Sequence, residues 1–427
     1  MATMKSYKKR IFDRLLAEAL EAKGAVLLQG PKWCGKTTTA EQVAKSVLYM
    51  ADPEKVEQNL LAAETRPGRL LRGESPRLID EWQIAPGLWD AVRFDIDHAD
   101  RLGKFILTGS AVPPDKGKIR HTGTGRFAWL TMRPMSLFES LESKGGVSLA
   151  DLFAGRGEPG DAMGHSLEEV AYLACRGGWP QATAMSGKAA LRQASDYVDA
   201  IAENDISRVD GTRRDPATAR RILRSLARLQ GTQASVGAVR ADLAANETRD
   251  FHENTVYSYI GALKKIFVVE DMEAWCPNLR CKTPVRTADT RYFTDPSIAT
   301  AALGLGPEDL MDDLKTFGFV FETLVARDLR SYAAALDGQV YHYKDKSGLE
   351  CDAVVHLRNG RYGLVEIKLG GERLVAEGER TLDRLAGEID TQRMRPPSFR
   401  MVVVAAGDFA YVRPGGVIVC PVGALRP

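Results

Sequence analysis

The segment Gly30–Thr38 has the residue types and spacing that bind a phosphate. It reads GPKWCGKTT, which matches the GxxxxGK[ST] pattern of a phosphate-binding loop. Gly30 and Gly35 allow tight turns that point backbone N–H groups at phosphate oxygens, and the dipole of a following helix attracts the anion. Lys36 is expected to reach the β- and γ-phosphates, and the Thr37 hydroxyl to join the shell of a Mg²⁺ ion. The residues predicted to surround the nucleotide are Gly30, Pro31, Lys32, Trp33, Cys34, Gly35, Lys36, Thr37 and Thr38.

An acidic pair closes the apolar stretch Leu78–Glu81, whose sequence is LIDE. Asp80 is expected to hold Mg²⁺, directly or through water, and Glu81 to polarise the water that attacks the γ-phosphate. Acidic residues are also common in ordinary turns, but the position of this pair downstream of a phosphate loop favours the catalytic interpretation. The expected cofactors are therefore ATP and Mg²⁺, and the expected reaction is ATP hydrolysis.

Two further side chains are candidates for a part in hydrolysis. Thr108, near the end of FILTGS at Phe105–Ser110, could orient the water or sense the γ-phosphate, as could Ser110; a hydroxyl that only caps a strand end is the alternative. Arg126 precedes the next apolar stretch and could reach the γ-phosphate of a neighbouring subunit, as an arginine finger does. A solvent-exposed arginine in a turn is the alternative here. With Arg126 as a finger, the protein forms a homo-oligomer, for which a hexamer is one candidate.

The elements around these side chains must place them at one edge of a sheet. Apolar runs predict strands at 25–29, 47–50, 77–80, 104–109 and 126–131, and helices are predicted at 10–22, 36–46 and 87–98. This alternation predicts a parallel sheet, which binds its ligand at the carboxyl ends of its strands. The phosphate loop, Asp80 and Thr108 all lie at such ends, so they are expected to meet there.

The composition sets limits on the rest of the molecule. A chain of 427 residues is too long for one hydrophobic core, so several domains are expected. The formal net charge of +2 excludes a globally polycationic protein, so any nucleic-acid surface must be local. No apolar run approaches membrane-spanning length and the N-terminus has no signal-like segment, so a cytoplasmic protein without membrane contact is expected. The six cysteines are scattered, and they are expected to be reduced.

Basic residues crowd the middle of the chain. Helical segments up to about residue 275 are followed by strand-like residues at 291–294, an order that suggests a winged helix. Its recognition helix is predicted to begin with Asn254, Tyr257 and Tyr259. Such a scaffold suits contacts to the phosphates of double-stranded DNA, although winged helices also serve as spacers or protein-contact modules. The core residues expected from helical spacing are Val256, Ile260, Leu263 and Phe267. The basic residues are Arg208, Arg213, Arg214, Arg220, Arg221, Arg224, Arg228, Lys264, Lys265, Arg280, Lys282, Arg286 and Arg291.

The C-terminal part holds a second group of charged residues with possible chemistry: Glu322, Asp352, Glu366 and Lys368. The first lies in a helix predicted at 318–332, and the others lie on two strands of a hairpin whose tight turn is Asn359-Gly360. Carboxylates at the end of such a hairpin can hold Mg²⁺, and a lysine beside them can orient a hydroxide and stabilise charge on phosphate. An ordinary cross-strand pair of glutamate and lysine is the alternative.

Together these motifs resemble those of the AAA-type ATPases. More narrowly, they resemble bacterial and archaeal ATP-binding proteins that join an AAA-type module to a C-terminal domain of unknown function, the DUF4143 family. The resemblance rests on GPKWCGKT, LIDEWQ, LTGS, the GR before a strand, RPMSLFE at Arg133–Glu139 and GGWP at Gly177–Pro180, and it covers nearly the whole chain. It implies a parallel sheet with an additional strand and a helical lid. It also implies a nucleotide-sensing arginine in the lid, for which Arg176 is the candidate; GGWP could instead be a turn that closes a helix.

The C-terminal pattern resembles the PD-(D/E)XK nuclease superfamily. A helix with Glu322 is followed by a hairpin that carries Asp352 and the Glu-x-Lys motif at 366–368, then by a predicted helix near 374–389 and a strand near 401–405. The resemblance implies metal-dependent cutting of DNA, although such domains can persist as binding modules after losing their chemistry.

The expected fold is therefore α/β, with four predicted domains. They are an AAA-type P-loop parallel sheet at 1–135, a helical lid at 136–207, a winged-helix domain at 208–311 and a PD-(D/E)XK nuclease-like domain at 312–427. Three functions stay open. The first is a Mg-ATP-hydrolysing ATPase that acts on DNA, or is regulated by it, through the winged helix and the nuclease-like domain. The second is an ATP-regulated, metal-dependent DNA nuclease. The third is a nucleotide-driven assembly or signalling switch that acts through protein partners.

Overall fold

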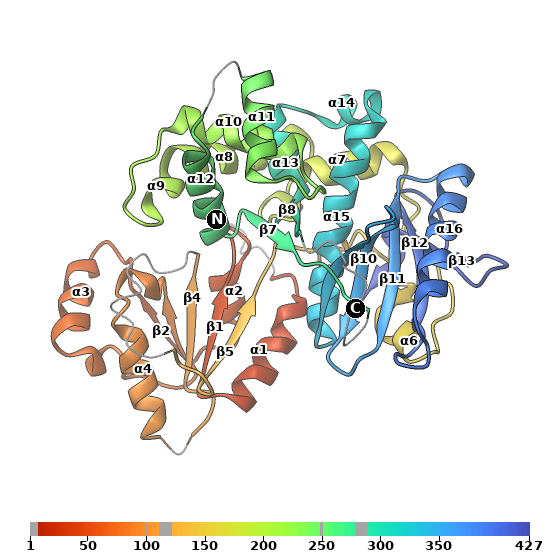
Figure 1. Ribbon diagram of the computed structural model, residues 1–427. Coiled ribbons are helices and arrows are strands. Elements are labelled where there is room, and N and C mark those ends of the chain that lie inside the picture. The colour runs from red at the N-terminus through yellow and green to blue at the C-terminus, as the bar shows by residue number, and fades with distance from the viewer. Residues whose placement is uncertain (1–6, 100, 111–121, 248–250, 278–287) are drawn as a thin grey trace. The chain divides into compact units, whose positions relative to one another are not determined.

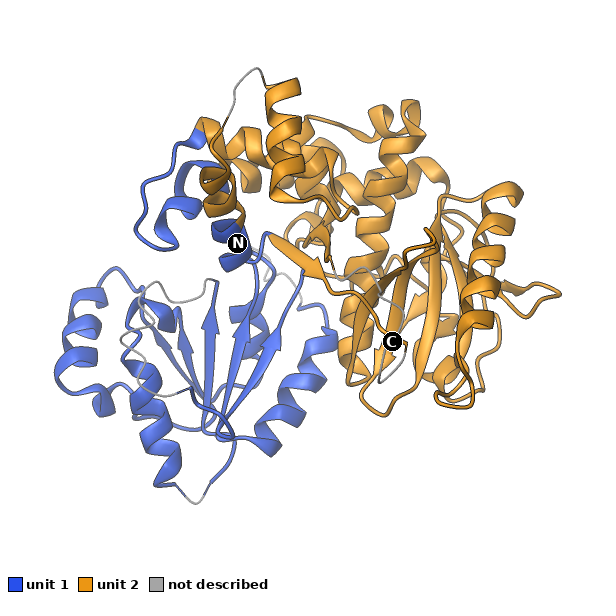
Figure 2. Cartoon of the chain, viewed as in Figure 1, with its two compact units in different colours: residues 1–134, 201–216, 261–268 blue, residues 135–200, 217–260, 269–427 orange. Residues whose placement is uncertain are grey.

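The computed structural model describes residues 7–99, 101–110, 122–247, 251–277 and 288–427. The chain divides into two compact units that each draw on separate stretches of sequence (Figure 2). Unit 1 comprises residues 1–134, 201–216 and 261–268, and unit 2 comprises residues 135–200, 217–260 and 269–427.

Unit 1 is built on a five-stranded sheet with the order β2-β3-β4-β1-β5 (Figure 1). All of its neighbouring strands are parallel, which confirms the predicted parallel sheet. Its strands are β1 (Ala25–Gln29), β2 (Ser46–Tyr49), β3 (Arg77–Asp80), β4 (Phe105–Gly109) and β5 (Phe127–Thr131). Asp80 lies opposite Thr108 in the register of β3 and β4, so the carboxyl ends of these strands lie together, as expected.

Helices cover both faces of this sheet. Alternate residues of β1 enter two different core clusters: Leu28 packs in the cluster of Leu16, whereas Leu27 packs in the cluster of Trp89. Both faces are therefore buried, as is usual for a parallel sheet. The helices are α1 (Ile11–Ala22), α2 (Lys36–Glu41), α3 (Val56–Thr65) and α4 (Leu88–Asp97).

Two details of unit 1 differ from the predictions. Helix α2 ends at Glu41 and Ser46 already begins β2, so the helix predicted at 36–46 is too long. Helix α3 was not predicted, and its one fully buried residue is Asn59. Because no apolar residue of α3 is fully buried, its sequence carries little of the periodicity by which helices are recognised.

The C-terminal part of unit 2 is a six-stranded mixed sheet with the order β13-β14-β12-β11-β10-β9. Neighbouring strands from β9 to β11 are antiparallel, those from β11 through β12 to β14 are parallel, and β13 is antiparallel to β14. The strands are β9 (Gly338–Lys344), β10 (Glu350–Leu357), β11 (Tyr362–Lys368), β12 (Phe399–Val404), β13 (Tyr411–Val412) and β14 (Ile418–Pro421). The predicted hairpin is β10–β11, and the predicted C-terminal α/β fold is confirmed.

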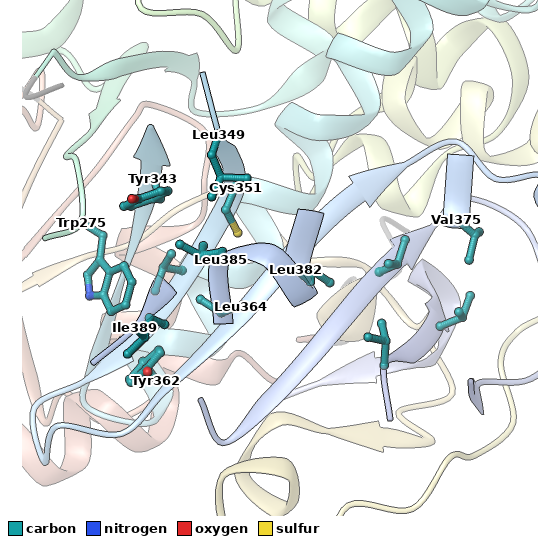
Figure 3. Packing of buried hydrophobic residues seen from close by; sticks show 14 of the residues in the cluster. Trp275, Tyr343, Leu349, Cys351, Tyr362, Leu364, Val375, Leu382, Leu385 and Ile389 are labelled. Carbon is teal, nitrogen blue, oxygen red and sulfur yellow. The ribbon is translucent and has the colours of Figure 1, made fainter. Parts of the chain in front are cut away.

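Two long helices accompany this sheet, α15 (Leu314–Ala335) and α16 (Glu372–Glu388). Leu382 and Leu385 of α16 point toward Leu364 of β11 in a core that also holds Tyr362 (Figure 3). Trp275, from the middle of the chain, enters the same core and lies 4.9 Å from the ring of Tyr362 between centroids. The middle segment is thus anchored in the C-terminal domain.

The middle of the chain has three helices followed by a two-stranded antiparallel sheet. The predicted core residues Val256, Ile260, Leu263 and Phe267 are all buried. The elements are α10 (Pro216–Arg228), α11 (Val236–Asn246), α12 (Glu253–Lys265), β7 (Val269–Met272) and β8 (Thr290–Phe293). Their order is the predicted one, while the winged-helix assignment itself stays a prediction.

The remaining helices of unit 2 lie mostly in the region predicted as a lid. They are α5 (Leu137–Ser140), α6 (Leu149–Phe153), α7 (Leu167–Arg176), α8 (Gly187–Ala200), α13 (Pro296–Leu303) and α14 (Pro307–Asp312). Strand β6 (Val147–Ser148) pairs in parallel with β15 (Leu425–Arg426). The beginning of the predicted lid therefore packs on the C-terminal domain, and the four domain boundaries stay predictions.

The cysteines differ from the expectation at one position. Cys34, Cys175, Cys351 and Cys420 are free and buried, whereas Cys276 is disulfide-bonded, which corrects the expectation for that residue. Cys281, its near neighbour in sequence, lies outside the described residues. Among the described helices, none is long and apolar enough to cross a membrane.

Candidate functional site

The phosphate loop follows β1 and takes its shape from glycines. Gly30 and Gly35 have φ angles of +148° and +98°, in the region that favours glycine. A Cβ atom on Gly30 would lie 2.0 Å from the carbonyl oxygen of Met132, so no other residue fits. Trp33 also has a positive φ, of 65°, which is uncommon for a bulky residue and marks local strain.

Lys36 lies buried inside this loop, with 6% of its surface exposed. Its Nζ donates to the carbonyl oxygens of Gly30, at 3.0 Å, and Pro31, at 2.7 Å. An ammonium group at this depth needs acceptors on all sides. Carbonyl oxygens of the loop supply them here, at the place where a bound nucleotide would present phosphate oxygens.

Two hydroxyl groups from separate motifs meet at Asp80. The Thr37 hydroxyl donates to Asp80 Oδ1 at 2.7 Å, and the Thr108 hydroxyl donates to the same oxygen at 2.6 Å. The three residues belong to α2, β3 and the end of β4, so the sheet brings them together as predicted. Hydroxyl and carboxylate oxygens are the ligands that Mg²⁺ prefers, so Thr37 and Asp80 fit the proposed ion; their roles stay predictions.

Glu81 follows in a left-handed backbone conformation, with φ of +56°. Burial raises the pKa of its carboxyl and the charge of Asp80 raises it further, while Lys36, a hydrogen bond from Gln83 and Lys32 act in the opposite direction. The net shift favours the protonated form relative to an exposed glutamate, so Glu81 is a more basic carboxylate than usual. This suits a group that polarises water.

Gln83 is a residue of this site that the sequence analysis missed. Its Nε2 donates to the Glu81 carboxylate, and its Oε1 is buried without a hydrogen-bond partner among the described residues. A Cβ atom on Gly109, at the end of β4, would lie 2.8 Å from that Oε1. The only signal in the sequence was an amide two positions after the acidic pair, within LIDEWQ.

Arg126 is placed away from the phosphate loop of its own chain. It precedes β5, and its carbonyl oxygen accepts from the backbone N–H of Ala25, the first residue of β1. It therefore lies at the amino ends of the strands, opposite the edge that carries the loop. Its side chain is half exposed, and its Nε donates to Asp97 at 2.7 Å. A role as a finger would require a neighbouring subunit, and that role stays a prediction.

The second predicted group assembles at the end of the β10–β11 hairpin. Lys368 Nζ lies 2.7 Å from Glu366 Oε2 and 3.1 Å from Asp352 Oδ2. The backbone N–H of Ile367 donates to the same Asp352 oxygen at 2.7 Å. Glu322 of α15 accepts from the hydroxyl of Tyr292, and it feels the charges of Asp352, Lys368 and Glu366.

This group is crowded with negative charge. Burial, and then the charge of Asp352, raise the pKa of Glu366 to about 8 and that of Glu322 to about 8. Burial alone would lower the pKa of Lys368, but Asp352 and Glu366 outweigh it and raise that pKa well above its ordinary value. Glu366 Oε1 is buried without a hydrogen-bond partner among the described residues. An unpaired carboxylate oxygen beside other carboxylates fits a divalent cation.

The carboxylates are not gathered into a ready-made metal shell. In the described part of the chain, no three His, Cys, Asp or Glu side chains are grouped so that they could hold a metal ion. Lys368 bridges Asp352 and Glu366, and Tyr292 holds Glu322. Tyr292 was missed by the sequence analysis, because it lies 30 positions before Glu322 in a segment assigned to another domain.

Many of the arginines predicted to face DNA are paired with carboxylates. The pairs are Arg214–Asp210, Arg220–Asp199, Arg224–Glu247, Arg228–Asp242 and Arg291–Asp271. Their charge is therefore largely balanced within the chain. Tyr257 is 70% exposed, whereas Tyr259 is buried at 7%, so only the first is placed to contact a partner. The predicted residues Arg280, Lys282 and Arg286 lie outside the described residues.

The GGWP and RPMSLFE motifs join in a buried network. The backbone N–H of Met135 donates to the Gly178 carbonyl at 2.6 Å, and the N–H of Gly178 donates to Asp295 at 2.9 Å. Arg327 bridges Asp295 and Asp328. Arg176 is also held by an ion pair, with Glu142. These contacts favour the structural interpretation of GGWP, and nucleotide sensing by Arg176 stays a prediction.

Comparison with known proteins finds three families along the chain. Residues 22–141 match the AAA domain, residues 317–425 match a domain of unknown function, DUF4143, and residues 167–309 match another, DUF8612. The first two matches confirm the predicted combination of an AAA-type module with a DUF4143 domain.

Two curated relatives are similar to this chain over most of its length. Uncharacterised proteins of Mycobacterium tuberculosis and Mycobacterium bovis are each 27% identical over 356 residues, which cover 83% of this chain and 72% of theirs. Among solved structures, a Walker-type ATPase of Pyrococcus abyssi is 17% identical, with a TM-score of 0.42 over 70% of this chain and 97% of its own. The Orc1 protein of Aeropyrum pernix, solved in complex with DNA, is 16% identical, with a TM-score of 0.23 over 68% of this chain and 90% of its own.

Proposed function

We propose that the chain, whose residues 22–141 match the AAA domain and residues 317–425 match DUF4143, binds Mg-ATP and hydrolyses it at the phosphate loop. The observation that carries this proposal is the meeting of Thr37 and Thr108 on one oxygen of Asp80. A hydroxyl and a carboxylate at the carboxyl ends of parallel strands, beside a buried lysine, are the groups that a bound magnesium nucleotide requires.

Each residue has a distinct part in this proposal. Lys36 exchanges the carbonyl oxygens of the loop for the β- and γ-phosphates, and Thr37 and Asp80 hold Mg²⁺, which would supply positive charge to the phosphates. Glu81, whose pKa is raised by burial, accepts a hydrogen bond from the attacking water. Thr108, held by Asp80, orients that water or senses the γ-phosphate.

Lys36→Ala and Glu81→Gln separate binding from hydrolysis. Lys36→Ala should lose most of its affinity for ATP, because the phosphates lose their main cation. Glu81→Gln should bind ATP yet turn it over slowly, since an amide accepts protons poorly. The test is to measure ATP binding by calorimetry and phosphate release on the same samples. Lys45→Ala, at an exposed position, is the control. Unchanged turnover in both variants would overturn the proposal.

We further infer that DNA is the partner on which the ATP cycle acts or by which it is regulated. The helix order α10–α11–α12 before a two-stranded sheet supports this, as does the exposed Tyr257. The paired arginines of α10 favour the competing idea of a switch that acts through proteins. Turnover should therefore be measured with and without double- and single-stranded DNA at low and high salt, because phosphate contacts weaken steeply with salt. Turnover indifferent to DNA, with no binding at low salt, would favour the protein switch.

A second candidate activity is metal-dependent cutting of DNA at the C-terminal group. It is favoured by the unpaired oxygen of Glu366 beside Asp352 and Lys368. Cleavage that requires Mg²⁺ or Mn²⁺ should be lost in Lys368→Ala, because that lysine stabilises charge on phosphate. Lys344→Ala, which changes a lysine of β9 paired with Glu350, is the matched control. Equal cutting by the Lys368 variant would rule this site out as the source.

A further inference from the structure

An ion pair ties the phosphate loop to a distant segment of the chain. Lys32, within the loop, places its Nζ 2.6 Å from Asp205 Oδ1, although the two residues lie 173 positions apart. Both belong to unit 1. The Asp205 side chain is 11% exposed and that of Lys32 is 41% exposed, so the carboxylate is well shielded. A shielded pair is stronger than one in open solvent.

The segment that carries Asp205 is itself firmly built. Asp205 ends a π-helical turn at Ile201–Asp205, a geometry that concentrates at functional sites. Arg214, which is buried, donates to the carbonyl oxygen of Ile206 at 2.9 Å and pairs with Asp210 at 2.8 Å. These contacts order residues 201–216 and so fix the position of Asp205 beside the phosphate loop.

Lys32 also belongs to the loop that is proposed to hold the phosphates. It lies two positions after Gly30 and four positions before Lys36 in GPKWCGKTT. Backbone N–H groups of such a loop surround the phosphates of a nucleotide, so a lysine side chain on it can reach one of them. In the structure the partner of Lys32 is Asp205 instead.

We propose that Lys32 senses the γ-phosphate and that Asp205 is its counter-ion in the absence of ATP, so that ATP, unlike ADP, releases residues 201–216. The proposal rests on the proposed nucleotide site. A γ-phosphate carries more charge than one carboxylate and competes for the ammonium group, whereas ADP has no phosphate at that place. Residues 201–216 continue directly into α8 and α10, so their release would pass the state of the nucleotide to both helices.

The first test compares the binding of Mg-ADP with that of the non-hydrolysable analogue Mg-β,γ-imido-ATP to the full chain. Lys32→Ala should bind the imido analogue roughly tenfold more weakly, the usual loss for a hydrogen bond between charged groups, with ADP affinity little changed. Asp205→Asn should bind the analogue more tightly, because a competing carboxylate is gone. The double variant should behave like Lys32→Ala, since the effect of Asp205 acts through Lys32.

Matched controls separate this role from a general one. Lys55→Ala removes an exposed lysine paired with Asp52, and Asp199→Asn removes a carboxylate paired with Arg220; both should bind the two nucleotides as the unaltered chain does. If Lys32→Ala weakens ADP as much as the analogue, or if Asp205→Asn weakens the analogue, the inference is wrong. An unaltered chain that binds neither nucleotide would instead remove the proposed function.

Hydrogen exchange gives a second test. If the ion pair had only a structural role, amide exchange would not differ between the two nucleotides. In the unaltered chain, the imido analogue should raise amide exchange within residues 201–216 and ADP should not. Lys32→Ala should abolish the difference between the nucleotides, and Asp205→Asn should show fast exchange without any nucleotide. Equal exchange in 201–216 of the unaltered chain with both nucleotides would overturn the proposed release.

Discussion

At the scale of single residues, Gln83 bears most directly on how Glu81 and an attacking water would be positioned for hydrolysis. Its amide N–H₂ holds the Glu81 carboxylate, and its carbonyl oxygen is buried with no hydrogen-bond partner among the described residues. A buried acceptor without a donor costs stability, so its position beside the proposed catalytic carboxylate is consistent with a donor that arrives with the substrate. The attacking water would be such a donor.

Gln83→Ala should therefore slow hydrolysis and leave ATP binding intact. We expect roughly a tenfold or greater loss in the single-turnover rate, because Glu81 and the water lose their positioning. Single-turnover hydrolysis and equilibrium binding of ATP measure the two effects separately. Gln58→Ala, an exposed glutamine of α3, is the control, and an unchanged rate in Gln83→Ala would show that the amide has no catalytic part.

The C-terminal carboxyls make a prediction about pH. The pKa of Glu366 is raised from 4.5 to about 8, so the folded protein binds this proton more tightly than the unfolded chain does. The contribution of Glu366 to stability should then be fully present below about pH 4.5 and be lost as the pH rises toward about 8, by at most about 1.4 kcal/mol per pH unit. Urea unfolding at several pH values measures this slope.

Glu366→Gln should remove much of that slope, because the amide stays neutral throughout. Glu350→Gln, at an exposed position of β10, should keep it. If Lys368 gives way to a cation as the second candidate activity requires, added Mn²⁺ should stabilise the unaltered protein at pH 8 more than at pH 6, since the cation competes with the proton for the same oxygens. A slope that is the same in Glu366→Gln and the unaltered protein would contradict the assignment.

At the scale of elements, the GGWP turn fastens α7 to the start of α5 and to α15. Gly178 is the tightest point, since a Cβ atom there would lie 2.1 Å from the Met135 carbonyl oxygen and 2.9 Å from Arg327. Arg327 bridges two buried aspartates, and removing one partner from such a group leaves uncompensated charge. This turn therefore holds three separate segments of the chain together.

Gly178→Ala should lower the free energy of unfolding by about 2 kcal/mol or more, as overpacking against backbone does. Gly318→Ala is the matched control: it lies in α15 with nothing within 4 Å of its Cβ position. That variant should gain about 0.5–1 kcal/mol, because alanine favours a helix over glycine. Urea unfolding of both variants provides the comparison, and equal stability of the two would refute the tight contact.

At the scale of the whole molecule, Arg126 bears on whether the protein works alone. It lies at the edge of the sheet opposite its own phosphate loop, tied to Asp97. A catalytic role for it is therefore compatible only with action on the nucleotide of another subunit, which is the reason for proposing a homo-oligomer.

Arg126→Ala should bind ATP normally and lose turnover by roughly 10³-fold, the usual effect of removing an arginine finger. Mixing it with Glu81→Gln should restore part of the activity, because an intact Arg126 from one variant can serve an intact Glu81 of the other. Phosphate release from the mixture, against each variant alone, measures the rescue. Arg101→Ala, an exposed arginine, is the control; a mixture no more active than its components would speak against a shared site.

The sequence by itself determined which residues gather at the candidate nucleotide site, and the class of the fold. The phosphate loop, the acidic pair and the strand ends are local patterns, because spacing within a loop and periodicity within a strand depend on near neighbours. The parallel pairing of the strands follows from their alternation with helices, whereas their order in the sheet came from the structure. Hence Thr37, Asp80 and Thr108 could be expected to meet before the structure was known.

Only the tertiary structure decided which distant residues share a site. Asp205 beside Lys32, Tyr292 beside Glu322 and the carboxylates beside the arginines of α10 are joined by packing between segments far apart in the chain. No periodicity or motif records such contacts, since each residue is unremarkable in its own neighbourhood. A phosphate loop can be recognised in the sequence because its pattern lies within one short segment. The contact between Lys32 and Asp205 cannot, because the two residues lie 173 positions apart.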